Sequence, residues 1–465
     1  MHPTIFVIIG ITGDLASRKL IPALLALYAK RLLPERFAIV GFSRRPFSRE
    51  EFREFIREKM NVKPGDFKEE DIKHFLDHMS YEQGFFDNVP AYERLAERLK
   101  SIDDRWGQCS NKLFHLSVPP ALYDGILNRL SDSRLTEPCD DMTGWTRILI
   151  EKPFGSDIAA ARSLDKLLGK LFDEKQIFRI DHYLAKEALQ NILAFRFSNS
   201  MFEPVWRRQY IDKVHIKLFE KGDIEGRGAY YDKLGAMKDV GQNHLLAMLA
   251  LVAMEQPRSL SANDIRKERA AILSKLKSIP RRELTRRVIR GQYAGYLSES
   301  GVSPQSSTET YFRMEARLGS PRWRGVPFYL ESGKALYESK TEIDVYFKAS
   351  AAAKLRGQRS PELQNILTFR IQPDEGIRVK FFVKPPGYGF ETEPKTLRFK
   401  YAEASSFAPI PNDYERLIHD AFEGDQTLFA STDEIMASWK FVTPIIENLS
   451  RLHLNIYEKG AREII

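Results

Sequence analysis

The sequence near the N-terminus reads Ile5-Phe6-Val7-Ile8-Ile9-Gly10-Ile11-Thr12-Gly13-Asp14-Leu15-Ala16. The first five residues are apolar and mostly β-branched, which is typical of a strand buried on both faces of a parallel sheet. Apolar residues then recur at helical spacing, at Leu20, Leu24 and Leu27. A strand, a glycine-containing turn and a helix in this order form the context in which dinucleotides bind. This stretch therefore predicts a Rossmann-type domain.

The turn follows the pattern G-x-x-G-x-x-A. In a binding loop, Gly10 would make the turn, Gly13 would let the backbone approach a pyrophosphate, and Ala16 would allow close packing of helix against strand. A glycine pair alone is usually a plain turn. Its position between a strand and a helix favours the binding loop.

A second strand is predicted at residues 37–41, and Phe42-Ser43-Arg44-Arg45 follows it. A site selective for NAD usually has a carboxylate here to bind the ribose diol. A guanidinium instead suits the 2′-phosphate of NADP, because it can bind phosphate oxygens in a fork. The alternative is a pair of exposed surface arginines.

Polar side chains cluster in Arg179-Ile180-Asp181-His182-Tyr183-Leu184-Ala185-Lys186-Glu187, between a short predicted strand at residues 176–178 and a predicted helix at residues 188–193. A helix N-terminus favours an anion, and the i, i+4 spacing of His182 and Lys186 would place both on one helix face. The stretch predicts a phosphate site. A solvated turn with surface ion pairs is the alternative.

The order of residues 179–187 resembles R-I-D-H-Y-L-G-K-E, the active-site signature of the glucose-6-phosphate dehydrogenase family, with Ala185 replacing glycine. Residues 10–16 resemble the family's G-A-S-G-D-L-A loop, residues 116–120 its L-S-V-P-P loop, and residues 151–155 its E-K-P-F-G motif. The last of these motifs also suggests a cis peptide bond at Lys152-Pro153. The resemblance extends over nearly the whole chain.

The resemblance implies NADP-dependent oxidation of glucose 6-phosphate at C1, the first oxidative step of the pentose phosphate pathway. His244 would be the general base and Asp181 would orient it. The implied cofactor residues, for NADP with some use of NAD possible, are Gly10, Thr12, Gly13, Asp14, Leu15, Arg44 and Lys152. The implied substrate residues are Lys152, His182, Tyr183, Lys186, Glu220, Asp239 and Lys334. No metal is expected, since the redox chemistry belongs to the cofactor.

Two further motifs support the resemblance. Residues 226–244 reproduce the family's G-R-G-x-Y-x-D…R-D…Q-N-H intervals, with Lys238 in place of arginine, which keeps the charge but loses the fork geometry. Residues 325–334 resemble its G-V-P-F-Y-L-R-T-G-K loop, but Ser339 stands where the family often has another basic residue. Without these motifs, a histidine such as His244 beside an apolar helix is more often structural.

The chain is expected to form an α/β N-terminal Rossmann-type dinucleotide-binding domain, residues 1–177, and an α+β C-terminal domain, residues 178–465. Alternating segments after residue 310 predict a large, mainly antiparallel sheet with a free face. The family uses that face for dimerisation, so a homodimer or homotetramer is expected. Residues 263–291 carry arginines and lysines at helical spacing and predict a basic surface helix.

The composition fits a small-molecule enzyme. The formal net charge of +8 alone suggests nucleic acid, but anionic substrates account for it equally well and no nucleic-acid motif occurs. No segment is apolar and long enough to suggest membrane insertion. Cys109 and Cys139 are too few for a disulfide framework, which fits a cytoplasmic protein. Two rivals stay open: a dehydrogenase of another or unphosphorylated sugar, and a non-catalytic homologue.

Overall fold

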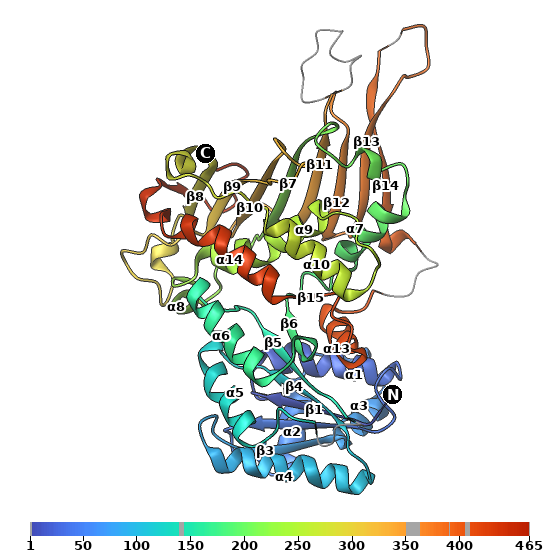
Figure 1. Ribbon diagram of the computed structural model, residues 1–465, viewed down its shortest axis with the longest axis vertical. Coiled ribbons are helices and arrows are strands. Elements are labelled where there is room, and N and C mark those ends of the chain that lie inside the picture. Colours follow the sequence, from blue (N-terminus) through green and yellow to red (C-terminus); the bar gives the residue numbers. More distant parts are fainter. Residues whose placement is uncertain (1, 139–143, 350–362, 390, 405–409, 465) are drawn as a thin grey trace. The chain divides into compact units, whose positions relative to one another are not determined.

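The computed structural model describes residues 2–138, 144–349, 363–389, 391–404 and 410–464 (Figure 1). The chain divides into two compact units. The first comprises Met1–Gly155, Ala159–Ala185 and Pro411–Thr432, and the second comprises Ser156–Ile158, Lys186–Ile410 and Asp433–Ile465. The division at residue 177 predicted from the sequence was contiguous, whereas here a segment from late in the chain belongs to the first unit.

The first unit is built on a sheet whose strands lie in the order β3-β2-β1-β4-β5-β6-β15. The strands are β1 (Thr4–Ile9), β2 (Phe37–Ser43), β3 (Met79–Gln83), β4 (Asn111–Leu116), β5 (Thr146–Glu151), β6 (Ile177–Ile180) and β15 (Phe429–Ala430). All neighbours run parallel except β15, which pairs antiparallel with β6. This is the Rossmann order, and every residue of β1 is buried, as expected for a sheet covered on both faces.

The connecting helices of this unit begin and end at local signals. They are η1 (Ala16–Leu20), α1 (Ile21–Ala29), α2 (Arg49–Lys59), α3 (Glu69–Asp77), α4 (Val89–Trp106), η2 (Pro120–Leu122), α5 (Tyr123–Asp132), α6 (Ile158–Leu171), η3 (Glu174–Gln176) and α13 (Asp413–Glu423). Ser48 and Glu51 form a capping box at the start of α2, and Gly107 ends α4 in the left-handed conformation.

The late segment joins the first unit for clear physical reasons. Asn412 caps the start of α13, and Arg147 donates hydrogen bonds to the carbonyls of Ala421 and Phe422 near its end (2.7 and 2.8 Å). Gln426 then donates to backbone carbonyls of Glu174 and Ile177 at 2.8 and 2.9 Å. These side chains provide partners for polar backbone groups that burial would otherwise leave unpaired.

The second unit is built on a large sheet in the order β14-β13-β12-β11-β7-β10-β9-β8-β16. Its strands are β7 (Ile211–Phe219), β8 (Val288–Tyr293), β9 (Tyr311–Arg317), β10 (Pro327–Gly333), β11 (Lys340–Phe347), β12 (Ile366–Gln372), β13 (Gly376–Val383), β14 (Glu393–Lys400) and β16 (Leu454–Tyr457). Only the β7–β10 and β8–β16 pairs among them are parallel. The predicted fold class is confirmed.

Helices cover one face of this sheet (Figure 1). The helical segments of the unit are α7 (Glu187–Ser198), η4 (Glu203–Val205), α8 (Gly228–Tyr231), η5 (Met237–Leu245), α9 (Leu246–Ala253), α10 (Ala262–Leu273), η6 (Arg281–Glu283), α11 (Leu284–Arg287), η7 (Tyr296–Ser298), η9 (Tyr401–Glu403), α14 (Thr432–Ile446) and η10 (Leu449–Arg451). The buried side of β7 carries Val214, Ile216 and Leu218 toward them, and α9 is almost wholly buried.

The opposite face of the large sheet carries charged side chains. Glu342 pairs with Lys217, Lys340, Arg370 and Arg378. Burial would raise the pKa of Glu342, but these cations outweigh it and hold that pKa at about 2. This half-buried layer therefore stays ionised at neutral pH.

Two sequence expectations require correction. Residues 263–291 do not form one basic surface helix: α10 ends at Leu273, and residues 288–293 form β8. Arg266, Arg269, Arg287 and Arg290 are buried, whereas Arg281, Arg282 and Arg286 are exposed. Arg269 pairs with Glu434 at 2.8 Å, and Arg290 donates to the Leu452 and Ser307 carbonyls. Their spacing reflects buried partners rather than a solvated face.

Cys109 is disulfide-bonded, which the cysteine count did not predict. Cys139, the other cysteine of the sequence, lies outside the described residues. Across the described parts of the chain, no helix combines the length and hydrophobicity needed to cross a membrane.

Candidate active site

The glycine turn of the first unit fits a dinucleotide phosphate. Gly10 has φ +88°, and a Cβ atom there would lie 2.4 Å from the Ser117 carbonyl oxygen, so only glycine is tolerated. The Gly13 N–H donates to the Gly10 carbonyl at 3.0 Å and tightens the turn. Thr12, Asp14 and Leu15 occupy the rest of it, and Asp14 is exposed. The turn therefore brings backbone groups to the carboxyl end of β1, where ligands bind in parallel sheets of this type.

The helix after this turn begins with an unpredicted conformation. Residues 16–20 are π-helical and lead directly into α1. Pro22 lies in the first turn of α1 and has no N–H to donate, so a regular α-helical ladder cannot run through this turn. Short π-helical stretches occur frequently at functional sites.

The loop after β2 is held by its backbone. The Tyr81 hydroxyl donates to the carbonyls of Ser43 (2.7 Å) and Arg45 (2.5 Å), and the Thr12 and Ser43 hydroxyls lie 2.8 Å apart. Arg44 is exposed beside this anchored turn. The structure thus brings the glycine turn and the start of the arginine loop together.

Lys152 follows the last residue of β5, at the carboxyl end of a parallel strand, where ligands bind in such sheets. The Lys152-Pro153 bond is cis, as predicted. Glu151 is fixed from three sides: the Tyr414 hydroxyl donates to its carboxylate (3.0 Å), the Tyr123 hydroxyl donates to its carbonyl (3.1 Å), and His115 lies 3.3 Å from the carboxylate. The backbone entering Lys152 is consequently rigid.

Within the signature at residues 179–187, Arg179 is a structural residue. It is 2% exposed and pairs with Asp165 and Glu174, each at 2.9 Å. Asp181 follows β6 and is 4% exposed; its carboxylate accepts the Tyr183 N–H at 3.0 Å. The rings of His182 and Tyr183 lie 4.9 Å apart.

The predicted helical pairing of His182 with Lys186 is wrong. Residues 182–185 form turns, and Lys186 is the extended N-cap residue of α7, which begins at Glu187. The i, i+4 relation therefore does not place the two side chains on one helix face. Lys186 instead occupies the N-terminus of α7, where the helix dipole favours anions.

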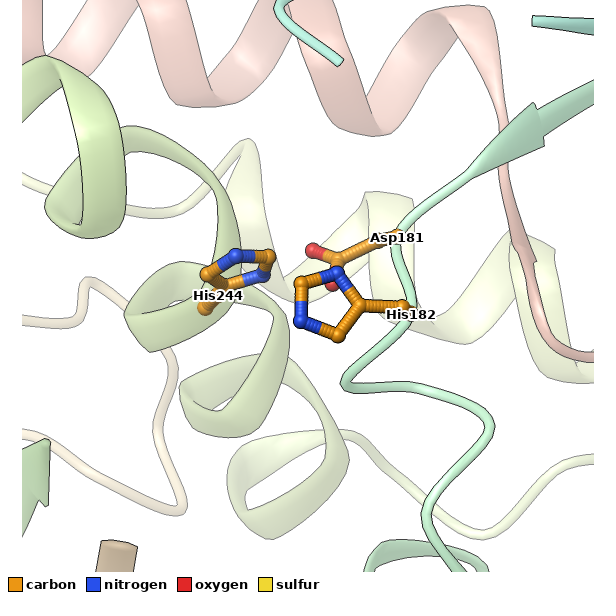
Figure 2. Close-up of side chains that lie close together, drawn as sticks. All are labelled: Asp181, His182 and His244. Carbon is orange, nitrogen blue, oxygen red and sulfur yellow. The ribbon is translucent and has the colours of Figure 1, made fainter. Parts of the chain in front are cut away.

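Asp239 and His244 lie on η5, the π-helical segment of the second unit. His244 is 2% exposed, and its backbone N–H donates a hydrogen bond to the side-chain oxygen of Asn243 at 2.6 Å. The Asn243 amide in turn donates to the Asp239 carbonyl at 3.0 Å. Figure 2 shows the His244 ring on this segment, and Asp181 and His182 on the segment that follows β6.

Lys334 and Glu220 meet directly in the second unit. Lys334 follows β10 and is 4% exposed, and its ammonium lies 2.5 Å from the Glu220 carboxylate and 5.3 Å from the Tyr231 ring centroid. Ser339 accepts the Lys221 N–H (2.8 Å), whereas Lys340 pairs with Glu338 and Glu342. Ser339, at the position that is often basic in the family, thus accepts a backbone hydrogen bond here.

Two buried groups near these residues had no signal in the sequence. The Tyr231 hydroxyl is buried without a hydrogen-bond partner among the described residues, and burial raises its pKa. Glu309 is 6% exposed and follows residues 301–308, a stretch rich in serine. Only packing against their neighbours distinguishes either residue from surface positions.

Comparisons with known proteins cover nearly the whole chain. A family model described as "Glucose-6-phosphate dehydrogenase, NAD binding domain" matches residues 7–191, and one described as "Glucose-6-phosphate dehydrogenase, C-terminal domain" matches residues 193–463. A glucose-6-phosphate 1-dehydrogenase of Aggregatibacter actinomycetemcomitans is 42% identical over 95% of this chain and 90% of its own length. One from Chlamydia muridarum is 40% identical over 97% and 91%.

The fold also matches a solved structure. A glucose-6-phosphate dehydrogenase in complex with its substrate glucose 6-phosphate superposes with a TM-score of 0.91 at 33% sequence identity, covering 99% of this chain and 95% of that one.

Proposed function

Because this chain belongs to the glucose-6-phosphate dehydrogenase family, we propose that it oxidises glucose 6-phosphate at C1 to 6-phosphoglucono-1,5-lactone with NADP as cofactor. The observation that carries the proposal is the full-length match to enzymes of this name, in a chain that keeps His244, Asp181, Lys186 and the glycine turn.

His244 is assigned as the general base. Its imidazole would take the proton from the C1 hydroxyl, and a neutral imidazole suits this task near pH 7. Asp181 would accept a hydrogen bond from the other ring nitrogen and stabilise the imidazolium that forms. Both side chains are buried, which supports these roles, because a carboxylate stabilises an imidazolium more strongly in a water-poor environment.

The first unit is assigned to the cofactor. The Gly10–Gly13 turn would let the backbone approach the pyrophosphate, and Arg44, which is exposed, would pair with the adenosine 2′-phosphate of NADP. When bound, NADP accepts the hydride from C1. Thr12, Asp14, Leu15 and Lys152 complete the assigned cofactor residues, and Lys152 would also contact the sugar.

The substrate is held by its phosphate and its hydroxyls. His182, Tyr183 and Lys186 would bind the phosphate, and Glu220, Asp239 and Lys334 would align the sugar. The Lys334–Glu220 pair supports this assignment, because the ammonium fixes the carboxylate in a single orientation from which it can accept hydroxyl hydrogens.

Substrate choice decides between this proposal and its rivals. We expect the purified protein to reduce NADP with glucose 6-phosphate and to have a far lower kcat/KM for glucose. The absorbance of the reduced nicotinamide measures both rates. Comparable values for the two sugars would favour an enzyme of unphosphorylated sugars. No turnover with glucose 6-phosphate and either cofactor would favour a non-catalytic homologue.

Assembly and location complete the proposal. The charged face of the large sheet, with Glu342 at its centre, would mediate a homodimer or homotetramer in the cytoplasm. Light scattering coupled to gel filtration tests the assembly: a monomer at micromolar concentration contradicts it. Fractionation of cells that express the full chain tests the location.

A further inference from the structure

Glu309 lies two residues before the start of β9 and is buried in the second unit, with 6% exposure. Its carboxylate accepts a hydrogen bond from the Met237 N–H at 3.0 Å, and its carbonyl accepts the Ala236 N–H, also at 3.0 Å. Met237 is the first residue of η5. Glu309 therefore provides a partner for an N–H group that a helix start leaves unpaired, although it comes from a distant part of the chain.

Gly235 makes this contact possible. It has φ +72°, and a Cβ atom at this position would lie 2.5 Å from a Glu309 carboxylate oxygen. Any other residue would therefore both strain the backbone and displace the carboxylate. The Glu309 carboxylate can therefore approach the start of η5 this closely only because residue 235 is glycine.

The segment that presents Glu309 is held by the motif at residues 226–232, to which the proposed function gives no role. The Asp232 carboxylate accepts hydrogen bonds from the Tyr296 hydroxyl (2.9 Å) and the Ser303 N–H (3.2 Å), and from the Ser306 hydroxyl. The Thr308 hydroxyl donates to the Asp232 carbonyl at 2.7 Å. The segment before Glu309 is thus fixed along its length.

Gly228, the first residue of α8, also allows a close approach of the chain. A Cβ atom on Gly228 would lie 2.1 Å from the Ser300 carbonyl oxygen, so the segment can approach α8 only because this residue is glycine. The motif therefore builds the surface on which residues 300–308 lie, and these residues carry Glu309 to η5.

The electrostatics support the arrangement. Burial raises the pKa of Glu309, while the Met237 N–H and the positive charges of Arg290 and Lys238 oppose this shift. An acceptor at a helix N-terminus stabilises the helix through the orphan N–H and, when ionised, through the helix dipole. The segment stabilised in this way carries both Asp239 and His244.

We propose that Glu309 is a positioning residue that fixes the start of η5 and, through it, the placement of Asp239 and His244. This inference rests on the proposed function, in which His244 takes the C1 proton and Asp239 binds the sugar. In this proposal Glu309 acts through η5 rather than through contact with substrate or cofactor. Loss of the Glu309 side chain should therefore change kcat and KM for glucose 6-phosphate but leave KM for NADP unchanged.

The test compares Glu309→Ala with Glu309→Gln, and uses Glu315→Ala as the control. The control removes a carboxylate on β9 that pairs with Arg317 and Arg287. In Glu309→Ala we expect kcat to fall about 10- to 100-fold, KM for glucose 6-phosphate to rise, and KM for NADP to stay constant. Glutamine keeps an oxygen acceptor for the Met237 N–H, so Glu309→Gln should regain most of the activity. The control should keep the parent's kcat.

Backbone amide exchange of residues 236–245 gives a readout that needs no turnover. It should rise in Glu309→Ala and remain near the parent's rate in Glu309→Gln and the control. If Glu309→Ala cannot be purified, Gly235→Ala replaces it, because its Cβ atom displaces the carboxylate.

A folded Glu309→Ala, or Gly235→Ala in its place, with parental kcat, KM and exchange would overturn the inference. A parent protein without glucose 6-phosphate activity would instead refute the proposed function, and amide exchange would still test whether Glu309 holds η5.

Discussion

Cofactor choice can be tested at Arg44, where the structure isolates one interaction. The turn after β2 is held by backbone groups, since the Tyr81 hydroxyl bonds the Ser43 and Arg45 carbonyls, and Arg44 is exposed beside it. Removing the Arg44 side chain should therefore leave the turn in place. The expected loss is one charge-assisted hydrogen-bonding interaction with the 2′-phosphate.

Such an interaction contributes about 1.5–3 kcal/mol, which corresponds to roughly a 10- to 150-fold change. We expect Arg44→Ala to raise KM for NADP by about this factor and to change KM for NAD little. Arg44 can also stack on adenine, so a small effect on NAD is compatible with the reasoning. The parent should prefer NADP and retain some activity with NAD.

The assay is the initial rate of nicotinamide reduction at saturating glucose 6-phosphate, with each cofactor varied in turn. Arg45→Ala is the matched control, since the Arg45 guanidinium lies over the Phe55 ring, 5.4 Å from its centroid. It should affect NADP much less than Arg44→Ala does. Equal weakening of both cofactors by Arg44→Ala, or a parent that uses NAD more efficiently, would refute the reasoning.

Four further predictions concern the sugar site. His244→Ala should abolish most turnover but leave glucose 6-phosphate binding nearly intact, because a base acts only in the transition state; a near-normal kcat would contradict this. Lys186→Ala should weaken glucose 6-phosphate binding strongly, and equal affinities by calorimetry would remove its phosphate role. Lys334→Met should leave the Glu220 carboxylate without its cation 2.5 Å away, raising KM for the sugar and lowering kcat, with no change in KM for NADP; steady-state kinetics would show whether that split holds. Dialysis against EDTA should not reduce turnover, although Asp181, His182 and His244 are residue types that bind zinc; recovery only on adding a metal would reverse this assignment.

Local sequence patterns predicted the parts of the fold that depend on local chemistry. The β-branched run at residues 5–9 is a buried parallel strand, and Gly10 has the positive φ that its place in the turn requires. Alternation after residue 310 correctly predicted a region rich in strands. It missed β10, which lies within residues 325–334, the segment likened to a family loop. In these cases the periodicity of the side chains and the geometry of the backbone give the same answer.

Features that depend on distant partners could not be predicted. Arg269 and Arg290 have the spacing of surface residues, and partners far along the chain, such as Glu434 and the Leu452 carbonyl, explain their burial. The π-helical form of η5 also had no local signal, and the Met237 N–H at its start pairs with Glu309, which lies far along the chain. The roles assigned to the site residues came from motif resemblance and stay predictions.

The return of residues 411–432 to the first unit has a consequence for biosynthesis. Until β15 has been made, β6 is an edge strand with an unpaired row of backbone groups, and such edges recruit other chains. Gln426, which binds carbonyls beside β6, also arrives only at this stage. A ribosome must therefore translate most of the second unit before the sheet of the first unit is complete. Premature termination between Ile180 and Pro411 would release a Rossmann sheet with an uncovered β6 edge, which is prone to self-association.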